Sequence, residues 1–121
     1  MKQILVVEDD SAIRETIRIL LESEGYRVLA AKNGQDALEF LKKNETPCLI
    51  LLDLNMPVMD GWQFLQARKT DESIAAIPVV IISAVANHFH EEEVVGTVRK
   101  PFELETLLKV VKQYCGSRHA S

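Results

Sequence analysis

Short apolar runs alternate with segments of helical periodicity along the chain. The apolar runs cover residues 3–7, 27–31, 48–53 and 79–83, with a weaker run at 95–98. Runs of this length that are rich in Val, Ile and Leu predict buried strands. The segments between them repeat apolar residues every three or four positions, which predicts helices that bury one face. The alternation indicates an α/β domain whose parallel sheet is covered by helices on both faces.

The first helix has the clearest start and end in the sequence. Ser11 is the expected N-terminal cap and Gly25 the expected stop, while Arg14 falls on the polar side. Further helices are expected near 35–43, near 61–68 and in the last segment. The apolar stripes expected in the core are Ile13, Ile17, Leu20 and Leu21, then Ala37, Leu38 and Leu41, then Trp62, Phe64 and Leu65, and finally Leu104, Leu107, Leu108, Val111 and Cys115.

The chain length of 121 residues suits one domain, which we assign to 1–121 with a frayed tail at 117–121. Right-handed crossovers and a strand order of 2-1-3-4-5 give a doubly wound sheet of five parallel strands. This order puts the first and third strands side by side. Asp9 and Asp53, which follow or end those strands, are then neighbours.

Three of the apolar runs end in charged or hydroxyl side chains that together suggest one site. The first runs into Glu8, Asp9 and Asp10, the third into Asp53 and the fourth into Ser83, and the weak fifth run is followed by the pair Lys100-Pro101. The carboxyl ends of parallel strands lie at one edge of a sheet, where ligands bind. We therefore expect an acidic pocket that contains one lysine.

The acidic residues of this pocket need a compensating charge. Two carboxylates about 4 Å apart repel by roughly 4 kcal/mol at an effective dielectric constant near 20. Glu8, Asp9, Asp53 and Lys100 together carry a net charge of about −2, which a divalent cation balances unless carboxyl groups share a proton. Oxygen ligands favour Mg²⁺ or Mn²⁺ over zinc. The alternative is that these acids only cap helices and turns.

Composition excludes several other functions. The net charge is −4 and the fourteen Lys and Arg residues are scattered, which argues against direct nucleic-acid binding. No apolar stretch approaches the roughly 20 residues that span a bilayer, so we expect a cytoplasmic protein without membrane contact. Cys48 and Cys115 have no metal-type spacing, and we expect both to be reduced thiols.

The motifs at the strand ends also resemble those of a known family. The segments are Val7-Glu8-Asp9-Asp10, Leu52-Asp53-Leu54-Asn55-Met56-Pro57, Met59-Asp60-Gly61, Ile82-Ser83-Ala84 and Lys100-Pro101-Phe102. In this order, and across essentially the whole chain, they resemble the receiver domain of two-component response regulators. The resemblance implies a flavodoxin-like fold and a signalling switch rather than an enzyme.

The resemblance assigns a role to each site residue. Asp53 is implied as the phosphoacceptor, taking a phosphoryl group from a histidine of a kinase or phosphotransfer protein. Mg²⁺, or Mn²⁺ in its place, is implied at Asp9, Asp53, the backbone carbonyl of Asn55 and, through water, Glu8. Lys100 and Ser83 are implied as contacts of the phosphoryl oxygens, and the bond after Lys100 is often cis in the family. The resemblance also implies a downstream protein or output domain that reads the switch, and it leaves open whether the chain forms a homodimer.

Two features depart from the family pattern. Only sixteen residues separate Ser83 from Lys100, so we expect a shortened fourth helix region. The family commonly has Tyr or Phe three residues before the lysine, where this chain has Thr97. His88 and His90 precede three glutamates, but their spacing matches no standard metal site, and a solvated loop is the preferred interpretation.

These departures keep two other functions open. One is a receiver-like interaction module that no longer depends on phosphorylation, which Thr97 and the short fourth region favour. The other is a small Mg²⁺-dependent phosphohydrolase that uses Asp53 as its nucleophile. Such enzymes typically carry a second acid two residues after the nucleophile, and this chain has Asn55 there.

Overall fold

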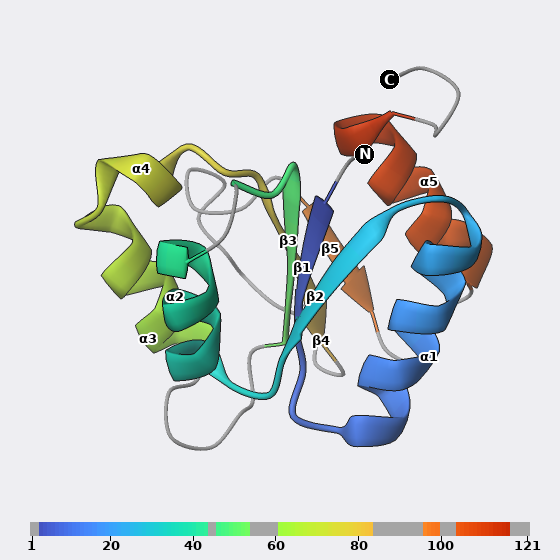
Figure 1. Cartoon of the computed structure of the whole chain (residues 1–121), viewed down its shortest axis with the longest axis horizontal. Coiled ribbons are helices and arrows are strands. Elements are labelled where there is room, and N and C mark those ends of the chain that lie inside the picture. The colour runs from blue at the N-terminus through green and yellow to red at the C-terminus, as the bar shows by residue number, and fades with distance from the viewer. Residues whose placement is uncertain (1–2, 44–45, 54–60, 84–95, 100–103, 117–121) are drawn as a thin grey trace.

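The computed structural model of the chain describes residues 3–43, 46–53, 61–83, 96–99 and 104–116 (Figure 1). Helices and strands alternate as expected. The strands are β1 (Gln3–Val7), β2 (Arg27–Ala31), β3 (Leu49–Asp53), β4 (Val79–Ser83) and β5 (Gly96–Arg99). The helices are α1 (Ser11–Ser23), α2 (Gly34–Lys43), α3 (Gly61–Lys69), α4 (Glu72–Ala75) and α5 (Leu104–Cys115).

The strands form one parallel sheet in the order β2-β1-β3-β4-β5. The predicted flavodoxin-like α/β class with a parallel sheet is confirmed. In the register of the central pair, Val7 lies opposite Leu52, so β3 ends one residue beyond the end of β1. The region expected to hold a shortened fourth helix, with His88 and His90, falls within 84–95 and lies outside the described residues.

Two layers of side chains cover the sheet. Alternate residues of β1 point to opposite faces: Ile4 and Val6 pack with α1 and α5, whereas Leu5 and Val7 pack with α2, α3 and α4. Figure 1 places α1 and α5 together on one side of the sheet and the other three helices on the opposite side. Both layers meet β3, which is buried along its whole length up to its last residue, Asp53.

The N-cap of helix α1 lies one residue before the expected one. Asp10, not Ser11, is the N-cap, and its carboxylate accepts hydrogen bonds from the backbone N–H groups of Ala12 and Ile13 at 2.9 and 3.1 Å. A carboxylate is also the better partner for the positive end of a helix dipole. The predicted stop is confirmed, since Gly25 follows the helix with a φ of 94°.

Two further helical predictions need correction. The stripe of α5 is confirmed at Leu107, Val111 and Cys115, which are buried, but Leu104 at the first turn is 42% exposed. A first-turn residue has no preceding turn to pack beside, so periodicity overestimates its burial. The short helix α4 was not predicted, because four residues are too few to show a helical period.

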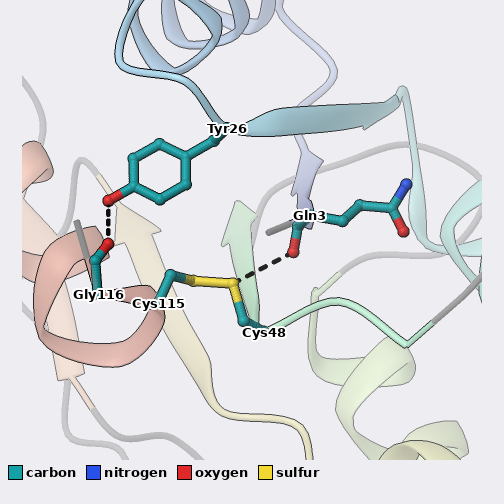
Figure 2. The surroundings of a disulfide bond; sticks show 5 residues. All are labelled: Gln3, Tyr26, Cys48, Cys115 and Gly116. Atoms are coloured by element: carbon teal, nitrogen blue, oxygen red, sulfur yellow. Dashed lines mark hydrogen bonds between the residues drawn. A yellow bond between two sulfur atoms is a disulfide. The ribbon is translucent and has the colours of Figure 1, made fainter. Parts of the chain in front are cut away.

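The prediction of two reduced thiols is wrong for this structure. Cys48, just before β3, and Cys115, the last residue of α5, form a disulfide across 67 positions of sequence (Figure 2). Their pairing depends on the packing of the end of α5 against the start of β3. Sequence spacing does not reveal that packing, and the absence of a metal motif does not exclude it.

No helix among the described residues is long and apolar enough to cross a membrane.

Candidate metal centre

The acidic residues of β1 and β3 converge at the carboxyl end of the sheet. Val7 pairs with Leu52, and the next residue on each strand path is an acid, Glu8 after β1 and Asp53 at the end of β3. One carboxylate oxygen from each of Glu8, Asp9 and Asp53 lies within 4.8 Å of the others. The predicted proximity of Asp9 and Asp53 is confirmed.

The three carboxylates differ in their exposure. Glu8 is fully buried, Asp53 is 4% exposed, and Asp9 is open to solvent. Two of the groups are therefore buried, and the third faces solvent.

The electrostatics of this cluster favour a cation. Two charged oxygens 4.8 Å apart repel by about 3 to 4 kcal/mol at an effective dielectric constant near 20. The donor set consists only of carboxylate oxygens and one of its residues is exposed to water, which suits Mg²⁺ or Mn²⁺ rather than a metal that prefers nitrogen or sulfur. The residues present fit such an ion.

The loop that carries Glu8 and Asp9 is anchored at three points. The backbone N–H of Glu8 donates to the carbonyl of Ala31 at 3.0 Å, and the Glu8 carboxylate accepts from the backbone N–H of Asp10 at 3.2 Å. The guanidinium of Arg14 donates to the carbonyls of Glu8 and Asp9 at 2.8 and 3.4 Å. These bonds fix the backbone on which two of the three acids stand.

Arg14 is a site component that the sequence did not indicate. Its spacing placed it on the polar side of the first helix together with Arg18. Arg18 does behave as a surface residue and pairs with Glu22 at 2.6 Å and with Glu15. Arg14 instead turns back toward the loop. The available signal was its position, one turn after the helix cap and six residues after Glu8.

The other predicted site residues are placed only in part. Asn55 and Lys100 lie outside the described residues, as does the side chain of Ser83. The backbone of Ser83 is defined and pairs with Arg99 at the ends of β4 and β5. Asp53 pairs with Ile82, so the backbone of Ser83 stands one residue beyond the level of Asp53. The side chain of Thr97 also lies outside the described part of the chain.

The family model for the response regulator receiver domain matches residues 4–112. The chain belongs to this family. The match includes every strand except the first residue of β1, and it contains the acidic cluster. Receivers act as phosphoacceptors in two-component signalling, and they bind Mg²⁺ at an acidic pocket such as the one formed by Glu8, Asp9 and Asp53.

Individual receivers and response regulators resemble this chain over nearly its full length. The polar-differentiation response regulator DivK of Brucella anthropi is 29% identical over 120 residues, which cover 95% of this chain and 97% of DivK. The structure of the chemotaxis protein CheY4 of Vibrio cholerae superposes with a TM-score of 0.85 at 30% identity, covering 94% of this receiver and 98% of CheY4. TrrA of Thermotoga maritima, in complex with Mg²⁺-BeF, gives a TM-score of 0.81 at 29% identity, covering 94% and 99%.

Proposed function

We propose that Asp53 is the phosphoacceptor of this receiver and takes its phosphoryl group from a histidine of a kinase or of a phosphotransfer protein. The observation that carries this proposal is the convergence of Glu8, Asp9 and Asp53 within 4.8 Å at the ends of two adjacent strands. Of the two aspartates, Asp53 is held by a strand that is buried throughout, which is suitable for a nucleophile that must keep its position.

The same acids, with the backbone carbonyl of Asn55, are the proposed ligands of Mg²⁺, for which Mn²⁺ can substitute. When bound, the cation offsets the charge between an anionic nucleophile and an anionic donor. The carboxylates of Glu8 and Asp9 supply negative charge that attracts the ion. Arg14 holds the backbone under both residues, which keeps the two carboxylates in place before an ion arrives.

In the proposed transfer, a carboxylate oxygen of Asp53 attacks the phosphorus atom. The new P–O bond forms while the P–N bond to the donor imidazole breaks, and the electron pair of that bond stays on the imidazole, which then takes up a proton. Lys100 and Ser83 are the proposed partners of the phosphoryl oxygens, as an ammonium and a hydroxyl donor. The product is an acyl phosphate at the carboxyl edge of the sheet.

The consequence of phosphorylation is a shift between two conformations that a partner or an output domain reads. A shift from 1:99 to 99:1 needs about 5.5 kcal/mol of differential affinity, which a few charge-assisted hydrogen bonds supply. In this proposal the chain is one receiver domain over 1–121, works in the cytoplasm without binding nucleic acid or membrane itself, and has no external substrate that it turns over. A homodimer is compatible with it.

Intact mass spectrometry after incubation with acetyl phosphate and Mg²⁺ tests the assignment. We expect the native chain to gain one phosphoryl group, and expect the gain to disappear with Asp53→Asn or with excess chelator. Asp10→Asn is the matched control, because it removes a neighbouring carboxylate but keeps an oxygen that can cap α1. A gain that persists in Asp53→Asn would assign the phosphoryl group to another residue, and no gain in a folded native chain would favour the phosphorylation-independent module. Either result would refute the proposal.

A further inference from the structure

The disulfide joins two parts of the fold with different tasks. Cys48 immediately precedes β3, at the opposite end of that strand from Asp53, and Cys115 closes the last turn of α5 (Figure 2). Their Cα atoms lie 5.5 Å apart, which is within the normal range for a bridged pair. We propose that Cys48 and Cys115 are a site of reversible thiol oxidation, whose state sets how firmly the last turn of α5 is held.

The structure also offers a hydrogen-bond acceptor to the reduced form of Cys48. The sulfur of Cys48 lies 3.3 Å from the backbone carbonyl oxygen of Gln3. A disulfide sulfur has no proton to donate, so this contact becomes an S–H···O hydrogen bond only when Cys48 is a thiol. Cys115 is buried among apolar residues, where a free thiol packs as a small hydrophobic group. Both thiols therefore have suitable surroundings, although the two sulfurs must move apart from bonding distance to van der Waals contact when the bond is reduced. We expect this separation to occur without unfolding.

The two cysteines differ in their exposure. Cys48 is half-buried, whereas Cys115 is buried, so in this proposal the reagent attacks at Cys48. Reduction by a small thiol begins with attack of its thiolate on the Cys48 sulfur, which breaks the S–S bond and releases the Cys115 thiolate. A second small thiol then attacks the mixed disulfide, and the products are two protein thiols and one small-molecule disulfide. Oxidation is the reverse exchange, with the small disulfide as the electron acceptor.

The covalent bond adds to weaker tethers at the same end of α5. The hydroxyl of Tyr26 donates to the carbonyl of Gly116 (Figure 2), and Lys112 pairs with Glu24 at 3.9 Å on the surface. The backbone N–H of Gly116 donates to the carbonyl of Lys112 at 2.9 Å, so its exchange with solvent reports opening of this turn. When the disulfide is reduced, only the non-covalent tethers resist that opening.

In a reducing compartment the state of this cysteine pair would follow changes in the thiol pool. Cytosolic thiol pools keep most cysteines reduced, so a bond that forms there does so when the pool becomes more oxidised. The receiver would then have a rigid C-terminal turn under oxidising conditions and a looser one otherwise. The acidic cluster lies at the other end of β3, so the two controls occupy opposite ends of one strand.

The experiment is a redox titration of the folded chain in mixtures of reduced and oxidised glutathione. Samples are quenched with acid, alkylated in denaturant and weighed by intact mass spectrometry. We expect a reversible change between no alkylated cysteine and two, with the circular dichroism of a folded chain in both states. A chain that forms no disulfide in oxidised glutathione, that is reduced only after denaturation, or that unfolds on reduction would overturn the proposal.

Hydrogen exchange then tests the effect on α5. We expect the Gly116 amide to exchange about tenfold more slowly in the oxidised chain than in the reduced one. Cys48→Ser is the matched control, because its hydroxyl can also donate to the Gln3 carbonyl but cannot form the bond; its exchange should not depend on glutathione. Equal exchange in both states of the native chain would refute the control of α5. Neither assay uses Mg²⁺ or a phosphoryl donor, so the result is independent of the function proposed for Asp53.

Discussion

The guanidinium of Arg14 donates a hydrogen bond to the backbone carbonyl of Glu8 at 2.8 Å, and thereby ties the first turn of α1 to the loop that carries the acidic pair. The bond joins a half-buried cation to the backbone beside a fully buried carboxylate. The position of the acids consequently depends on the helix that follows them as well as on β1. Loss of this tether should affect the metal site before it affects the core.

Arg14→Ala is expected to lower the affinity for Mg²⁺ by about tenfold, the lower end of the range for residues that support metal ligands. Removal of a nearby positive charge acts in the opposite direction, but the charge is partly solvated and its effect is the smaller one. Isothermal titration calorimetry measures the affinity. Arg18→Ala is the control, because it removes an arginine of the same helix that pairs with Glu15 and Glu22 on the surface. Unchanged or tighter Mg²⁺ binding in Arg14→Ala would contradict this role.

Asp53→Asn is expected to stabilise the chain by about 1 to 3 kcal/mol when Mg²⁺ is absent, because it removes one of three mutually repelling carboxylates. Saturating Mg²⁺ should stabilise the native chain, by about 2.7 kcal/mol at one hundred times its dissociation constant, and stabilise the variant less. Urea unfolding with chelator and with Mg²⁺ measures both effects. Glu39→Gln, at an exposed position of α2, should leave both values near those of the native chain. A variant that is less stable than the native chain in chelator would refute the repulsion argument.

The sequence was sufficient for the parts of this molecule that repeat a local pattern. The buried runs ending in Asp53 and Ser83 place those strands within one residue of their observed bounds, since a short apolar run flanked by turns has few other interpretations. The juxtaposition of Asp9 and Asp53 also followed from the sequence, because strand order in a doubly wound sheet is limited to a few choices.

The remaining features could not be predicted for two reasons. Some depend on contacts between segments that are distant in sequence, and others on a choice between two neighbouring residues that are equally suitable. The disulfide forms because the end of α5 packs against the start of β3, and the sequence spacing of Cys48 and Cys115 does not indicate that contact. Asp10 and Ser11 are both good caps, and only the backbone decides between them. Arg14 has the sequence position of an ordinary polar helix residue, and only the conformation of the preceding loop brings its guanidinium to the Glu8 carbonyl.

Asp10→Ala is expected to destabilise the chain by about 0.5 to 2 kcal/mol, because two backbone N–H groups at the start of α1 lose their acceptor. Asp10→Asn should recover most of this loss, since an amide oxygen caps a helix nearly as well as a carboxylate. Urea unfolding of the three chains gives the comparison. If Asp10→Ala and Asp10→Asn are equally destabilised, the charge and not the capping bond is what α1 requires.

Tyr26 should make the stability of the chain fall above about pH 10. Burial, followed by the charge of Glu24, raises the pKa of its hydroxyl above the ordinary value near 10. The contribution of Tyr26 is therefore complete below the pKa of the unfolded chain. It is lost as the pH rises toward the folded value, because the unfolded state releases its proton first.

Tyr26→Phe removes the hydrogen bond to the Gly116 carbonyl. It should therefore lower the free energy of unfolding by about 0.5 to 1.5 kcal/mol near pH 8, and by less near pH 11. Urea unfolding at both pH values, in a Cys48→Ser background that excludes alkaline disulfide exchange, gives the two differences. A Tyr26→Phe cost that is the same or larger near pH 11 would contradict a raised pKa of the Tyr26 hydroxyl in the folded chain.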